Sequence, residues 1–245
     1  MASFSTTATI NEPEISRDDH GTPPPFRSGG DDGRPGLPDY GTRLRRARLG
    51  LLVALTPILM LFVSFTSAYV VRQGLPTLDP RTNNLIRDWI PVALPRLLLL
   101  NTFVLLVSSL SMELARRQLQ SQVALATTSP AAGNTLSSKI RIPWLGVTLV
   151  LGLAFLFGQW AAWQQLAANG FYVATTPSSS FVYLLTGAHA AHLLGGVLAL
   201  LIAGIASLLH RSLKTRSIVV DVTAWYWHFM AVLWIYIFCL MKFVR

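Results

Sequence analysis

The sequence predicts an all-α membrane protein with five transmembrane helices. Just over half of the 245 residues are hydrophobic (52%), and 13% are charged, whereas a typical soluble domain has about 25% charged residues. Five apolar stretches each approach or exceed the roughly 20 residues that cross a bilayer. They lack the alternating pattern of β-barrel strands. A helix pairs its own backbone groups inside hydrocarbon, so we expect each stretch to be helical.

The N-terminal 42 residues have the composition of a disordered tail. They contain seven acidic residues, the runs Pro23-Pro24-Pro25 and Gly29-Gly30, and few large apolar side chains. Such a segment buries too little apolar surface to offset the entropy lost on ordering. We therefore expect residues 1–42 to be an acidic, Pro- and Gly-rich cytoplasmic tail, and residues 43–245 to be the transmembrane domain.

Charged and turn-forming residues divide the transmembrane domain into its spans. The first span follows a basic run that ends at Arg48, and the second follows Asp88-Trp89-Ile90-Pro91. The later spans are separated by stretches that contain Lys, Arg, Ser or Thr. We expect the spans at about 47–71, 92–115, 143–167, 180–210 and 219–243.

Lys and Arg are unevenly divided between the two sides of this arrangement. Eleven fall on the side of the N-terminus and six on the opposite side. Because cytoplasmic loops carry the excess of basic residues, the N-terminus is predicted to be cytoplasmic and the C-terminus periplasmic. These basic residues flank spans and form no stripe on a polar domain, so nucleic-acid binding is excluded despite the net charge of +9.

Three histidines inside the spans are candidates for function, since polar side chains are costly in a bilayer. His189 and His192 lie three residues apart on the fourth span, and His228 lies on the fifth. Imidazole binds iron and copper, so one hypothesis is a small b-type haem-binding membrane anchor that uses these histidines. We favour structural hydrogen bonds, between helices or to lipid phosphates, because a metal site usually needs three or four converging ligands.

Aromatic and basic side chains near the span ends form a second group of candidates. Trp225 and Tyr183 suit a membrane interface. Trp227 belongs to the aromatic run that begins at Trp225, and Arg96 begins the second span, where its head group can reach water. We expect structural or lipid-binding roles for them. A membrane transporter, the third hypothesis, would need polar residues along a path near mid-membrane, and these are scarce.

Two motifs resemble subunit III of haem–copper respiratory oxidases. The fourth span contains Leu185-Thr186-Gly187-Ala188-His189-Ala190-Ala191-His192, similar to the Leu-Thr-Gly-x-His-x-x-His segment of that family. The fifth contains Tyr226-Trp227-His228-Phe229-Met230-Ala231-Val232-Leu233-Trp234, similar to the family signature Tyr-Trp-His-Phe-x-Asp-x-x-Trp. Shorter likenesses in the first two spans extend the resemblance to about residues 43–245.

The resemblance implies the five-helix bacterial form, an accessory subunit of a proton-pumping terminal oxidase in the bacterial inner membrane. Such a subunit is non-catalytic and holds no cofactor. Haem, copper and the reduction of oxygen, with cytochrome c or quinol as electron donor, belong to partner subunits. The implied partners are catalytic subunit I, subunit II and membrane phospholipids, and phospholipid is the candidate ligand.

Both membrane carboxylates of the family are missing from the matching positions. The first span reads Leu55-Thr56-Pro57-Ile58 where the family has a glutamate, and Ala231 stands where it has an aspartate. We therefore expect a role in stabilising the catalytic subunit and binding lipid, in preference to a role in handling protons.

Overall fold

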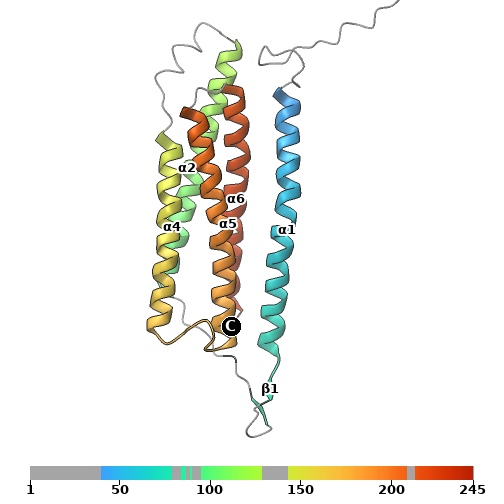
Figure 1. Ribbon diagram of the computed structural model, residues 1–245, viewed down its shortest axis with the longest axis vertical. Helices are drawn as coiled ribbons and strands as arrows, with labels where there is room; N and C mark the ends of the chain where they lie inside the picture. The colour runs from blue at the N-terminus through green and yellow to red at the C-terminus, as the bar shows by residue number, and fades with distance from the viewer. Residues whose placement is uncertain are drawn as a thin grey trace, which may run out of the picture. The chain divides into compact units, whose positions relative to one another are not determined.

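The computed structural model describes residues 40–78, 84–86, 89, 95–128, 143–208 and 213–244. Five long helices make up most of this part of the chain: α1 (Tyr40–Gly74), α2 (Leu97–Thr128), α4 (Pro143–Ala168), α5 (Pro177–Leu208) and α6 (Leu213–Phe243) (Figure 1). All five are long and apolar enough to cross a membrane. The prediction of an all-helical membrane protein with five spans is therefore confirmed.

Several helix ends differ from the predicted spans. α1 and α6 begin earlier than residues 47 and 219, and α2 ends well after residue 115. The added turns are rich in Arg, Lys and Gln. Hydropathy marks only where the bilayer ends, and a helix can continue beyond that point into water, where polar side chains are favourable. The predicted tail lies outside the described residues, except that 40–42 form the first turn of α1.

The predicted loop between the first two spans contains a short antiparallel pair of strands. β1 (Thr77–Leu78) pairs with β2 (Leu85–Ile86), with Thr77 opposite Ile86. These two-residue strands are the described β-structure of the chain, and they connect α1 to α2 without altering the helical class.

Local sequence explains the tight connection between α4 and α5. Gly170 has φ +83°, and Phe171 N donates to Leu166 O at 3.0 Å, which is the hydrogen bond of a Schellman motif that ends a helix at glycine. Thr176 then caps α5, since its Oγ1 accepts from Ser179 N at 3.2 Å, and proline follows at the first helical position.

Four of the helices form a closed arrangement, which we call the four-helix ring. Around the ring, α2 packs on α4, α4 on α5, α5 on α6, and α6 on α2. α1 lies outside the ring and packs against α5 and α6 (Figure 1). Because the helices alternate in direction, α1, α4 and α6 begin at the same end of the bundle, which we call the charged end.

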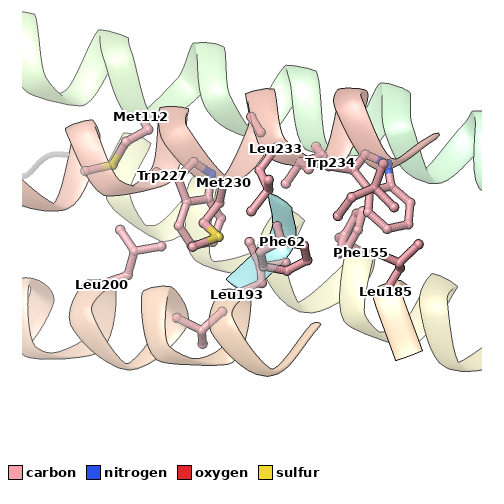
Figure 2. Close-up of a cluster of buried hydrophobic side chains, with 14 of the residues drawn as sticks. Phe62, Met112, Phe155, Leu185, Leu193, Leu200, Trp227, Met230, Leu233 and Trp234 are labelled. Atoms are coloured by element: carbon pink, nitrogen blue, oxygen red, sulfur yellow. The ribbon is translucent and has the colours of Figure 1, made fainter. Parts of the chain in front are cut away.

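Two tryptophans of α6 fill the interior of the ring. Trp227 and Trp234 are both fully buried, and their spacing of seven residues places them on one face of the helix. Trp227 Nε1 donates to Ser108 Oγ of α2 at 3.2 Å, and Trp234 Nε1 donates to Thr102 Oγ1 of α2 at 2.9 Å. Figure 2 shows both indoles among buried side chains of the neighbouring helices.

Small and aromatic residues on α4 and α5 complete the contacts of these indoles. A Cβ at Gly152 of α4 would lie 2.7 Å from Trp227 Cη2, and one at Gly196 of α5 would lie 3.2 Å from Trp227 Cε3. The Trp234 ring meets the ring of Phe155 edge-on, with centroids 4.9 Å apart. α6 thus touches all three other helices of the ring through two side chains.

A methyl group at Gly152 should destabilise the bundle. The Trp227 ring has no room to retreat, because Gly196 lies close to it and Ser108 holds its N–H group. We expect Gly152→Ala to lower the free energy of unfolding by about 1–2 kcal/mol, the overpacking penalty minus the helix-propensity gain. Thermal unfolding in lipid nanodiscs, followed by tryptophan fluorescence, measures this.

Gly146→Ala on the same helix is the matched control, since nothing lies within 4 Å of its Cβ position. It should be neutral or stabilise the protein by up to about 1 kcal/mol. Equal effects of the two substitutions would contradict the packing of Trp227 against Gly152.

Candidate functional site

The charged end contains a buried carboxylate that the sequence analysis did not single out. Asp221 lies in α6, and 1% of its side chain is exposed. Arg48 of α1 binds it with two hydrogen bonds, from Nε to Oδ2 at 2.8 Å and from Nη2 to Oδ1 at 2.9 Å. From α2, Arg116 Nη1 and Gln120 Nε2 donate to Oδ1 at 3.2 and 3.1 Å. Four donors from two helices therefore surround this carboxylate.

A second carboxylate continues these contacts along α2. Glu113 accepts two hydrogen bonds of 2.8 Å from Arg116 and one of 2.7 Å from Arg117. His228 Nε2 of α6 lies 3.4 Å from Glu113 Oε2, and His228 Nδ1 lies 2.6 Å from Ser109 Oγ. We call the whole set the charged network: Arg48, Ser109, Glu113, Arg116, Arg117, Gln120, Asp221 and His228.

The charged network joins α1 to the four-helix ring. A lone carboxylate is costly at membrane depth, and a pair of arginines with good geometry compensates for that cost. The buried residues of α1 are Leu55, Phe62 and Tyr69, and further hydrogen bonds between α1 and α6 involve side chains such as Tyr40 and Thr66. Together with Arg48 the three buried residues recur every seven residues, so they form one stripe along the helix. The ion pair with Asp221 thus fixes one end of that stripe.

The three candidate histidines lie in three different surroundings. His189 is fully buried, with its ring centroid 5.0 Å from that of Trp234 and 5.8 Å from that of Phe155. His192 faces α1, where its ring centroid is 5.8 Å from that of Phe62, and its Nδ1 lies 2.7 Å from Ala188 O. His228 belongs to the charged network. Within the described ranges, no group of three His, Cys, Asp or Glu side chains is placed to hold a metal ion.

The other candidates divide between the surface and the interior. Trp225 is half exposed, and the Arg48 guanidinium lies 5.9 Å from its ring centroid. Arg96 is exposed in the turn before α2. Trp227 lies inside the ring and is fully buried. Tyr183 donates to Phe171 O at 3.0 Å and to Trp163 O at 3.3 Å, so it ties α5 to the end of α4.

Sequence patterns contained a signal for the charged network. Arg48, Leu55, Phe62 and Tyr69 share a seven-residue spacing, which predicts that the arginine faces the same helices as the apolar stripe. An arginine on a packed face needs an acidic partner, and Asp221 is the acidic residue of the last span. The pattern does not identify the helices that contact this stripe, because those contacts depend on tertiary packing.

This arrangement defines a multi-pass membrane protein whose buried polar groups mostly connect one helix to another. The sequence model of the family described as cytochrome c oxidase subunit III matches residues 42–244. The chain therefore belongs to the cytochrome c oxidase subunit III family, and the resemblance found in the motifs of the last two spans is confirmed.

Curated relatives from bacteria and eukaryotes agree with this assignment. The chain is 29% identical to the probable cytochrome c oxidase subunit 3 of Mycobacterium leprae over 102 residues, which are 42% of this chain and 50% of the relative. It is 30% identical to cytochrome c oxidase subunit 3 of Corynebacterium diphtheriae, with the same coverage. For the Anopheles gambiae protein of that name the identity is 28% over 196 residues, 78% of this chain and 66% of the relative. The chain thus spans about half the length of the bacterial relatives it matches.

Removing the charge of Asp221 should loosen α1 from the bundle. Asp221→Asn keeps the shape of the side chain but leaves two arginines without their counter-ion at this point. We expect the free energy of unfolding to fall by about 2–3 kcal/mol, as for other charge-assisted hydrogen bonds in partly buried sites. Chemical denaturation in mixed micelles measures it.

Arg117→Ala provides the control on the same network. Its side chain is 73% exposed and makes one ion pair, so its loss should change stability by under about 0.5 kcal/mol. If Asp221→Asn were as mild as Arg117→Ala, the charged network would not be an anchor for α1.

Proposed function

We propose that this chain is an accessory, cofactor-free subunit of a terminal oxidase, where it stabilises the catalytic subunit and binds phospholipid. The observation that carries this proposal is the family match over residues 42–244, nearly all of the helical bundle. The chemistry of oxygen reduction then belongs to haem and copper in catalytic subunit I, with subunit II beside it. The electron donor, cytochrome c or quinol, would bind to those subunits.

The packing of the ring interior supports a scaffold in preference to a catalytic or transport role. The centre of the ring is filled by Trp227, Trp234 and Phe155, which are fully buried. A transporter needs a polar path through this region. In the described part of the interior, buried polar side chains such as Ser108 and Asn101 bond neighbouring helices, and the large aromatic rings fill the space between them.

The surroundings of the histidines weigh against the alternative of a b-type haem anchor. An axial ligand must present a ring nitrogen to an open space beside the haem. His189 is enclosed by the rings of Phe155 and Trp234, and His192 Nδ1 is already paired with Ala188 O. His228 lies between two polar side chains of α2. These contacts favour structural roles for all three.

Charge distribution supports insertion in the bacterial inner membrane with the charged end facing the cytoplasm. Among the described residues that end carries the larger share of the basic side chains: Arg43, Arg45, Arg46, Arg48, Arg116, Arg117, Lys214 and Arg216. The opposite end carries Arg72, Arg96 and Lys242. The positive-inside rule then gives a cytoplasmic N-terminus and a periplasmic C-terminus.

The outer surface of α1 supports phospholipid binding. Arg45 and Arg46 are exposed at the charged end. On the next turns of the same helix, Leu49 and Val53 are 55% and 74% exposed. Guanidinium groups above an apolar surface suit an anionic head group and its acyl chains. Arg96, in the turn before α2, and Trp225 of α6 are exposed and offer further contacts for a head group.

Purification of the tagged chain from its own membranes tests the proposed function. We expect a large haem-bearing subunit to copurify, because the scaffold role requires a stable complex. Native mass spectrometry of the same sample should show bound phospholipid. The chain expressed without partners should have no Soret absorption band.

Two outcomes would overturn the proposal. A chain that purifies as a stable monomer, with no haem protein attached under mild solubilisation, would contradict an accessory subunit. A Soret band in the separately expressed chain, lost in His189→Leu or His228→Leu, would favour the haem anchor instead.

A further inference from the structure

Two buried polar side chains in the ring interior have atoms without hydrogen-bond partners. Within the described part of the chain, neither ring nitrogen of His189 is hydrogen-bonded, nor is Gln159 Oε1. Both residues are buried, with exposures of 0% for His189 and 1% for Gln159. A buried polar atom without a partner is unfavourable, and hydrocarbon around the bundle offers no replacement.

Contacts on either side of Gln159 place it opposite His189. Phe155, Gln159 and Trp163 follow one another at four-residue intervals, so they share a face of α4. The Phe155 ring centroid is 5.8 Å from that of His189, and Trp163 Nε1 donates to Thr186 Oγ1 at 3.1 Å. Since α4 and α5 run in opposite directions, Gln159 faces the turn of α5 between Thr186 and His189.

The neighbouring polar groups are already paired with one another. Asn101 Nδ2 donates to Phe155 O at 3.1 Å. Thr186 Oγ1 accepts from Trp163 and donates to Val182 O at 2.7 Å. Trp234 Nε1 donates to Thr102. At this level of the ring, the buried side-chain atoms without any hydrogen-bond partner, among the residues that the structure describes, are the two ring nitrogens of His189 and Gln159 Oε1.

We propose that His189 and Gln159 together bind one buried water molecule between α4 and α5. The water donates one hydrogen bond to Gln159 Oε1. It forms a second hydrogen bond with a ring nitrogen of His189: it accepts from that nitrogen if the nitrogen carries a hydrogen, and donates to it if the nitrogen does not. Polar sites with two or more such partners hold water, whereas apolar cavities stay dry. The water links the two helices where the chain provides no direct bond.

A high-resolution cryo-EM map of the full chain, in the complex with which it purifies, tests the proposal directly. We expect a density peak at about 3 Å from both Gln159 Oε1 and a His189 ring nitrogen. A map in which the two side chains bond each other directly, or in which no peak lies between them, would overturn the proposal.

Substitution of the two residues gives an independent test. His189→Leu and Gln159→Leu should each lower the thermal midpoint by about 2–4 °C, because each leaves the other polar group unpaired. The double substitution should lower it by less than the sum, since removing both polar groups leaves no unpaired atom. His192→Leu is the matched control, because its imidazole bonds to its own helix. Additive losses, or single losses no larger than that of His192→Leu, would contradict the shared site.

Discussion

The lack of hydrogen-bond partners in hydrocarbon determines most of this structure. Each span is a helix because a helix satisfies its own backbone. The same constraint acts on side chains: the indole N–H groups of Trp227 and Trp234 are buried only because Ser108 and Thr102 of α2 accept from them. Asp221 is buried only because arginines from two helices surround it. Each of these three buried groups therefore specifies which helix lies beside it.

α6 makes the largest number of these specific connections. Its two indoles bind α2 and pack on α4 and α5, and Asp221 holds α1, which lies outside the ring. Van der Waals packing alone discriminates weakly among apolar helices in a membrane. Paired polar groups supply the discrimination that apolar surfaces lack. A scaffold subunit that must present a fixed surface to a partner would benefit from helices locked in this way.

Hydropathy and two motifs were enough to predict the five spans and the family, because both are local properties of the sequence. The helices α1, α2 and α6 extend beyond the predicted spans, since hydropathy follows the bilayer whereas the end of a helix follows its backbone hydrogen bonds. The structural role of Asp221 was missed because it depends on Arg48, 173 residues away in the sequence. The burial of Trp227 inside the ring could not be predicted, because it depends on Gly152 and Gly196 of two other helices.

The coupling between Trp227 and Ser108 tests most directly whether paired polar groups lock the ring. A double-mutant cycle with Trp227→Phe and Ser108→Ala, measured by reversible unfolding in mixed micelles, isolates the hydrogen bond from the loss of ring volume. Locking by paired groups predicts a coupling energy of about 1 kcal/mol, so that the second substitution costs less once the first is present. Strictly additive losses would show that the indole contributes only its volume, and would contradict the account.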